Sequence, residues 1–115
     1  SGEEYLRRNY PTHLLCEKLP RFLRGCPVYR FDLDNHFCFL DGGGGAPQAV
    51  DTLETLAALG VKTIVTVGMF GAFGENVNSG DIIIPNKAFV EEGTSLHYYD
   101  SIEYSVPPLP SISES

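Results

Sequence analysis

The sequence contains no apolar run of 18 residues, which is the length that a membrane-spanning helix requires. It also does not open with the basic residues, apolar stretch and small-residue cleavage site of a secretory leader. We therefore expect a cytoplasmic protein that does not bind membranes. Hydrophobic residues make up 43% of the 115 positions and charged residues 20%, a composition typical of a soluble globular chain with one core.

Cysteine and histidine are scarce and widely spaced. The three cysteines are Cys16, Cys26 and Cys38. The three histidines are His13, His36 and His97. Neither set has the close pairs of a zinc site, so we expect reduced, structural thiols and no metal. His13 is expected on a helix and His36 near a turn, both as surface residues.

Basic residues are few after position 40. Residues 41–115 contain two, Lys62 and Lys87, against ten acidic residues. Such a segment repels polyanions, so binding of nucleic acid through a basic face is excluded. An anionic substrate would have to be neutralised by backbone amides, by the first 40 residues or by another chain. The arginines of LRR (6–8) and LPRFLR (19–24) are expected on a solvated helix face.

The first 40 residues contain two different hydrophobic patterns. Between residues 3 and 24, leucines and Phe22 recur at helical spacing, so we expect helical pieces interrupted at Pro11 and Pro20. From Pro27 to Leu40 apolar and polar residues alternate around Asp34 and Asn35, which are turn formers. This second pattern predicts a β-hairpin.

The remaining chain predicts alternating helices and strands. A helix is expected from Pro47 to Gly60, because proline suits a first helical turn and glycine an end. The β-branched run 61–67 and the isoleucines 82–84 predict buried strands, and a short strand is expected at 88–90. We therefore predict an α/β fold, a mixed twisted sheet with flanking helices. Residues 1–104 would form the domain and 105–115, rich in proline and serine, a tail.

Four consecutive glycines, residues 42–45, precede the expected helix. Bare backbone at this position lets a ligand approach the main chain, and the helix N-terminus offers N–H groups to an anion or a hydroxyl. The P-loop pattern is absent because no Gly-Lys-Ser/Thr follows, and Pro47 occupies the place of the third glycine of a dinucleotide fingerprint. A purely structural role in strand-to-helix packing is the alternative, and a Rossmann-like nucleotide-binding module is a third reading.

Four landmarks between Tyr29 and Tyr104 resemble one known family. They are GGGAP at 43–47, LGVK at 59–62, VGMFGA at 67–72, and GDIIIP at 80–85 followed by EGTSLHY at 92–98. In this order and spacing they resemble the nucleoside phosphorylase and nucleosidase superfamily, of which the purine nucleoside and uridine phosphorylases are the best known members. The resemblance covers about the N-terminal half of the family's domain.

The resemblance implies cleavage of the N-glycosidic bond of a nucleoside by phosphate, or by water in the hydrolytic relatives. Inorganic phosphate is then a co-substrate, and no other cofactor is expected. The residues that the resemblance assigns to nucleoside binding are Gly43, Gly44, Gly45, Met69, Phe70, Gly71 and His97. No catalytic residue is assigned.

Two departures from the family's pattern leave a further reading open. Thr66 and Met69 stand where the family has a phosphate-binding arginine and a serine or threonine, so the main anion donors are replaced. The family's later ribose-binding and base-protonating segments are not in the sequence. A non-catalytic relative that binds nucleosides or serves in assembly is therefore the alternative function. Because half a sheet exposes an edge and apolar surface, we also expect a homo-oligomer.

Overall fold

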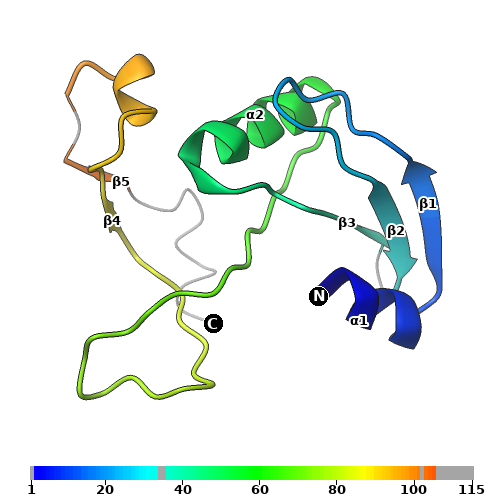
Figure 1. Ribbon diagram of the computed structural model, residues 1–115, viewed down its shortest axis with the longest axis horizontal. Coiled ribbons are helices and arrows are strands. Elements are labelled where there is room, and N and C mark those ends of the chain that lie inside the picture. Colours follow the sequence, from blue (N-terminus) through cyan, green and yellow to red (C-terminus); the bar gives the residue numbers. More distant parts are fainter. Residues whose placement is uncertain (1, 34–35, 102, 106–115) are drawn as a thin grey trace. The chain divides into compact units, whose positions relative to one another are not determined.

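The computed structural model describes residues 2–33, 36–101 and 103–105. The chain divides into two compact units, residues 1–66 and 67–115, and the first contains most of the regular structure (Figure 1). Of the tail predicted at 105–115, residues 106–115 lie outside the described residues.

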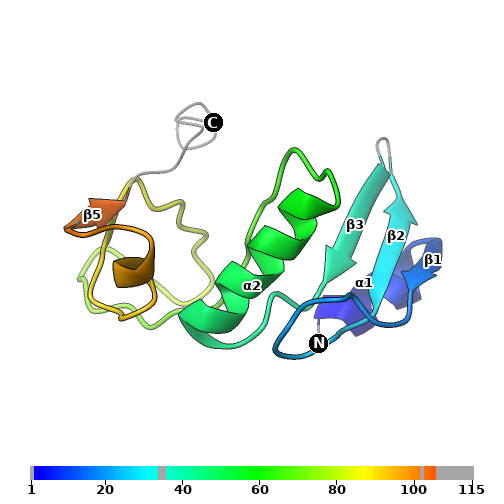
Figure 2. The same ribbon diagram turned by 90° about the horizontal axis from the view of Figure 1, so that it is seen from above.

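The sheet of the first unit confirms the predicted hairpin. Strands β2 (Val28–Asp32) and β3 (His36–Leu40) pair antiparallel, with Val28 opposite Leu40 and Asp32 opposite His36. Figure 2 shows the hairpin with β1 (Thr12–Cys16) on the other side of β2, which gives the strand order β1-β2-β3. The turn expected at Asp34 and Asn35 lies outside the described residues.

Residues 12–16 form a strand, so the prediction of helical pieces throughout 3–24 is wrong there. Helix α1 (Gly2–Asn9) ends before Pro11, because the ring of proline disfavours helical backbone in the residue before it. Beyond Pro11 the chain pairs with the open edge of β2, placing Thr12 opposite Phe31 and Leu14 opposite Tyr29. The hydrogen bonds offered by that edge outweigh the helical spacing of the leucines.

Helix α2 (Gly45–Ala58) confirms the prediction of a helix after the glycines. Pro47 lies in its first turn, where a missing N–H costs nothing, and Gly60 follows its end with φ +90°. The core of this unit consists of Leu19, Cys26 and Val28, with Cys16, Leu40 and Leu56 packed against it. Burial raises the pKa of the Cys26 thiol, which favours the unreactive protonated form.

Less regular structure is present in the second unit. Strands β4 (Ala88–Phe89) and β5 (Tyr104–Ser105) pair antiparallel, and η1 (Ser95–His97) is a short 3₁₀ helix. β4 confirms the strand expected at 88–90. The strands predicted at 61–67 and 82–84 do not form. A strand needs a neighbour for its backbone hydrogen bonds, and no described residues pair with these segments.

The α/β class is confirmed, since the described residues combine sheets with helices. Every strand pairing among the described residues is antiparallel. The predicted strand-helix-strand unit around α2 is therefore not completed, because the segment after α2 has no strand beside it. Helix α2 instead packs against the core of the first unit through Leu56.

Candidate functional site

The glycine loop, defined here as residues 42–45, connects β3 to α2. Gly43 and Gly45 adopt φ +92° and +78°, a region that side chains with a Cβ rarely enter. A Cβ on Gly43 would also lie 2.3 Å from Cγ of Gln48. Gly44, the N-cap residue, has φ −103° and ψ 123° and makes no side-chain cap. All four glycines are exposed, so the loop presents bare main chain to solvent.

Two amides of the glycine loop are held by neighbouring side chains. The N–H of Gly43 donates to Oδ1 of Asp41 at 2.8 Å, and the N–H of Gly44 donates to Oε1 of Gln48 at 2.8 Å. These oxygens occupy the positions that a ligand oxygen would take at the two amides. A ligand with a hydroxyl or anionic acceptor would therefore replace an existing hydrogen bond rather than fill an empty one.

Two buried polar side chains, those of Arg21 and Thr52, contact the backbone at the start of the glycine loop. Arg21 and Thr52 are only 5% and 4% exposed. Nη1 of Arg21 donates to the carbonyl of Asp41 and to Oγ1 of Thr52, both at 2.7 Å. The hydroxyl of Thr52 in turn lies 3.1 Å from the carbonyl of Gly42 and 2.8 Å from that of Gln48. The prediction of a solvated helix face for residues 19–24 is therefore wrong for Arg21, because this segment is irregular and folds against α2.

Asp51 connects the segment that carries Arg21 to helix α2. Its carboxylate accepts hydrogen bonds from the backbone N–H groups of Leu23 and Phe22, at 2.8 and 3.0 Å. These two bonds, with a smaller contribution from the charge of Arg21, lower the pKa of Asp51 below its ordinary value. The carboxylate therefore stays ionised and keeps the segment attached at neutral pH.

The other predicted site residues fall in both units. Thr66 ends the first unit, whereas Met69, Phe70, Gly71 and His97 belong to the second. All of them are exposed, and His97 is the last residue of η1. Gly43, Gly44 and Gly45 are brought together with Thr52 and Arg21 within the first unit. The roles assigned to the residues of the second unit stay predictions.

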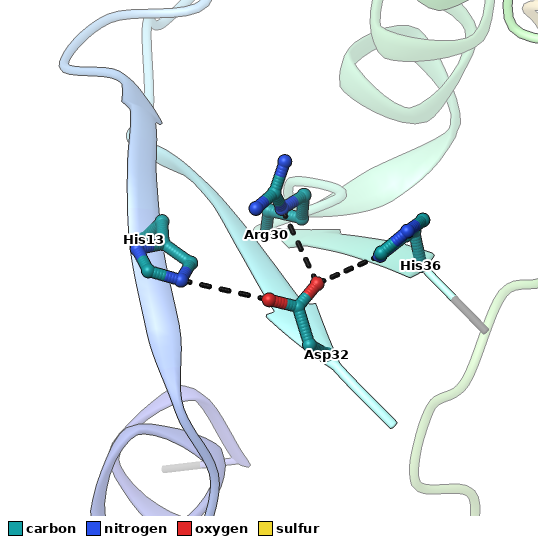
Figure 3. Close-up of polar contacts among 4 residues, drawn as sticks. All are labelled: His13, Arg30, Asp32 and His36. Carbon is teal, nitrogen blue, oxygen red and sulfur yellow. Dashed lines mark hydrogen bonds and ion pairs between the residues drawn. The ribbon is translucent and has the colours of Figure 1, made fainter. Parts of the chain in front are cut away.

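A second polar cluster lies on the three-stranded sheet, and no pattern in the sequence groups its members (Figure 3). Asp32 lies between two histidines: Nδ1 of His36 is 2.8 Å from its Oδ1, and Nε2 of His13 is 3.5 Å from its Oδ2. Nε of Arg30 is 3.3 Å from Oδ1, close enough for an ion pair, but this buried atom has no hydrogen bond partner among the described residues. The hydrogen bond with His36 is the main cause that lowers the pKa of Asp32.

Sequence reasoning expected His13 on a helix, and the structure corrects this because His13 lies on β1. The signal that was missed is the register of the hairpin. Residues 32 and 36 face each other across the turn, and a strand added beside β2 brings His13 opposite Arg30. Within the described part of the chain, no group of three or more His, Cys, Asp or Glu side chains is arranged to hold a metal ion.

The comparisons with known proteins point to one family. The family model described as the phosphorylase superfamily matches residues 7–114. A guanosine phosphorylase of Halorubrum lacusprofundi is 37% identical over 73 residues, which are 63% of this chain and 30% of that protein. A uridine phosphorylase of Escherichia coli is 34% identical over 72 residues, or 62% of this chain and 28% of its own. A uridine phosphorylase of Thermococcus kodakarensis is 40% identical over 62 residues, or 54% and 22%.

The matched part of the chain thus spans less than a third of the length of these relatives. No solved structure is a significant match to the chain. Among the helices in the described ranges, none has the length and apolar character needed to cross a membrane.

Proposed function

Since this chain belongs to the phosphorylase superfamily, we propose that it is a nucleoside phosphorylase-like protein whose glycine loop binds the nucleoside. The observation that carries the proposal is the loop itself. Gly43 to Gly45 expose main chain at the start of α2, in a conformation that two of the three could not adopt with a side chain. A ribose or a base can therefore approach the backbone more closely than it could at a turn covered by side chains.

The proposed reaction is phosphorolysis of the N-glycosidic bond. An oxygen of inorganic phosphate forms a bond to the anomeric carbon while the bond from that carbon to the base nitrogen breaks. The bonding electrons go to the base, which takes up a proton from water as it leaves. The transition state resembles an oxocarbenium ion, so the protein's work is to hold the ribose and place the phosphate. Phosphate is the co-substrate in this proposal, and no other cofactor is invoked.

From the resemblance we also propose roles for four residues of the second unit. Met69, Phe70 and Gly71 would contact the ribose and the nucleophile, and His97 would contact the substrate or a neighbouring subunit. Thr66 and Met69 stand at the two phosphate-binding positions. The hydroxyl of Thr66 lacks the charge and the fork of donors of an arginine, and the thioether of Met69 has no hydrogen to donate, so we propose weak binding of phosphate.

We further propose that the protein works as a homo-oligomer. Several large apolar side chains of residues 61–84 are exposed, among them Val67 at 94% and Ile82 at 93%. Isolated proteins rarely expose this much apolar surface in one region of sequence, and β-branched segments with unpaired backbone readily pair with another chain. Light scattering tests this point: a monodisperse monomer at micromolar concentration would contradict it.

A non-catalytic relative that keeps nucleoside binding is the second candidate. The substitutions at the phosphate positions favour it, because they remove anion donors without touching the glycine loop. Release of free base separates the candidates: phosphate-dependent release supports a phosphorylase, phosphate-independent release a nucleosidase that uses water, and binding without release the non-catalytic relative.

The glycine loop is tested by adding a side chain that the fold tolerates. Gly44 has an extended backbone conformation, and a Cβ placed on it meets no atom within 4 Å. We therefore expect Gly44→Val to fold normally and to obstruct an approaching ligand. Titration calorimetry with guanosine and with uridine should give an affinity at least about tenfold below that of the natural chain, which corresponds to about 1.4 kcal/mol.

Gly42→Ala is the control for this variant, because Gly42 belongs to the loop but is not one of the three glycines assigned to nucleoside binding. Its added Cβ also meets no atom within 4 Å, and Gly42 does not need a positive φ. We expect its affinity to stay within about twofold of the natural chain, since small surface changes rarely matter more. Equal affinity of Gly44→Val and the natural chain would contradict the proposed role of the loop. The absence of binding of both nucleosides by the natural chain would contradict it as well.

A further inference from the structure

Arg21 is the one charged side chain that is buried among the described residues. Burying a guanidinium is costly, because the charge loses its hydration and needs compensating partners. Among the described residues no carboxylate forms an ion pair with Arg21, and its Nη2 is buried without any hydrogen bond partner. The charge of Arg21 does help to lower the pKa of Asp51, but all the hydrogen bonds that Arg21 donates go to neutral groups.

Two of the three hydrogen bonds of Arg21 go to residues on either side of the glycine loop, Asp41 and Thr52. Nε donates to the carbonyl of Arg24, which shapes its own segment. Nη1 donates to the carbonyl of Asp41, directly before the glycines, and to Oγ1 of Thr52 in the second turn of α2. One rigid guanidinium thus joins the entry to the loop and the helix that follows it.

Thr52 extends this connection to the first residue of the glycine loop and to Gln48. Its hydroxyl contacts the carbonyls of Gly42 and Gln48, and Gln48 holds the amide of Gly44 through Oε1. The side chain of Asp41, whose carbonyl Arg21 holds, accepts the N–H of Gly43. The amide of Gly43 is therefore two contacts away from Arg21, through Asp41, and the amide of Gly44 is three contacts away, through Gln48 and Thr52.

We propose that Arg21 is a positioning residue that fixes the glycine loop in its ligand-binding conformation, acting through Asp41 and Thr52. The proposal rests on the nucleoside-binding role of the loop. The planar guanidinium is suited to this because its donors have fixed directions, so the two acceptors of Nη1 are held at a set distance from each other. Four glycines in sequence have many alternative conformations, and a preorganised loop loses less entropy on binding.

The test compares Arg21→Met with the natural chain in two measurements. Hydrogen exchange without ligand reports the loop directly: the amides of Gly43 and Gly44 should exchange about tenfold faster or more, while the β2–β3 amides keep their rates. Titration with guanosine and uridine should show a loss of affinity of about tenfold or more. The same loss is expected for Arg21→Ala, and there millimolar methylguanidine should partly restore the affinity, because the shortened side chain leaves room for it.

Arg8→Met is the matched control, since Arg8 is an exposed arginine in the last turn of α1. It should leave both measurements unchanged. Arg21→Lys, which keeps the charge but not the fork of donors, should fall between Arg21→Met and the natural chain. If Arg21→Met does not fold, Thr52→Val decides: it removes one acceptor of Nη1, and it should speed exchange at Gly43 and Gly44.

Unchanged exchange at Gly43 and Gly44 in a folded Arg21→Met chain would overturn the proposal. So would a loss of affinity that methylguanidine and Arg21→Lys both fail to recover. If the natural chain binds neither nucleoside, the proposed function fails, but the exchange rates still decide whether Arg21 fixes the loop.

Discussion

The two units of the chain differ in how far their apolar residues pack against other elements. In the first unit, Leu19, Cys26 and Val28 are buried between the hairpin and α2. In the second, Phe89 and Tyr104 face each other with ring centroids 4.8 Å apart, yet most large apolar side chains are exposed. A pattern of apolar residues becomes a strand or a core only when a second element supplies the other half of the contact.

The largest expected effect comes from replacing a valine by aspartate, once at a buried position of the first unit and once at an exposed position of the second. Val28→Asp puts a charge among the buried core residues, where it has no partner. We expect a loss of at least about 3 kcal/mol in the free energy of unfolding, or no folded first unit at all. Urea denaturation followed by circular dichroism measures the loss.

Val67→Asp is the partner experiment in the second unit, because Val67 is 94% exposed. We expect a change within about 0.5 kcal/mol in the same denaturation experiment. A large loss that persists after dilution would contradict the comparison, whereas a large loss that disappears on dilution would support the proposed homo-oligomer, in which another chain covers Val67. Dilution separates the two causes, because burial by another chain weakens with dilution.

Glycine substitutions test the same comparison with a smaller change in the free energy of unfolding, about a third of that expected for Val28→Asp. Gly60 has φ +90° directly after α2, so Gly60→Ala strains the backbone. We expect a loss of about 1 kcal/mol in the free energy of unfolding. Gly93→Ala, in the second unit, needs no positive φ and meets no atom within 4 Å, and it should change that energy by less than about 0.5 kcal/mol. Similar losses for both variants would contradict the assigned conformation of Gly60.

The smallest expected effect is the pH dependence of the first unit. The pKa of Asp51 is lowered in the folded chain, first by the hydrogen bond from Leu23 N–H. A lowered folded pKa contributes stability above the unfolded value, and this contribution is lost as the pH falls through the folded value. The melting temperature should therefore decrease on acidification below about pH 4.

Asp51→Asn removes this titration. We therefore expect a shallower acid limb, that is, a smaller fall of the melting temperature as the pH decreases below about 4. Asp32, whose pKa is lowered mainly by His36, contributes to the same limb, so Asp32→Asn serves as the comparison and the double variant should be flatter still. An acid limb of equal slope in the natural chain and in Asp51→Asn would show that the bonds from Phe22 and Leu23 do not hold the carboxylate.

The local signals in the sequence predicted those elements whose partners lie close along the chain. The hairpin 28–40 needed only alternation around a short turn, and α2 needed only Pro47, an apolar face and Gly60. The strand at 12–16 was missed because its partner edge lies 15 or so residues away, and Leu14 and Leu15 also fit a helical pattern. The strands expected at 61–67 and 82–84 carried strong β propensity, but propensity does not supply a neighbour.

The candidate site was predictable to the same extent. The glycines stood out because their conformational freedom is a property of the residue, and Gly43 and Gly45 do use positive φ. Arg21 did not stand out, because burial of an arginine follows from tertiary contacts with Asp41 and Thr52, far away in sequence. The grouping of His13, Asp32 and His36 likewise required the register of three strands.

The central claim, that the glycine loop binds a nucleoside, is tested most directly by an NMR titration of the ¹⁵N-labelled chain with guanosine and with uridine. We predict that the largest saturable changes in amide chemical shift occur at Gly43, Gly44 and Gly45, and that the amides of β1 and β2 remain unchanged. Changes confined to residues outside the loop, or no saturable change with either nucleoside, would contradict the claim.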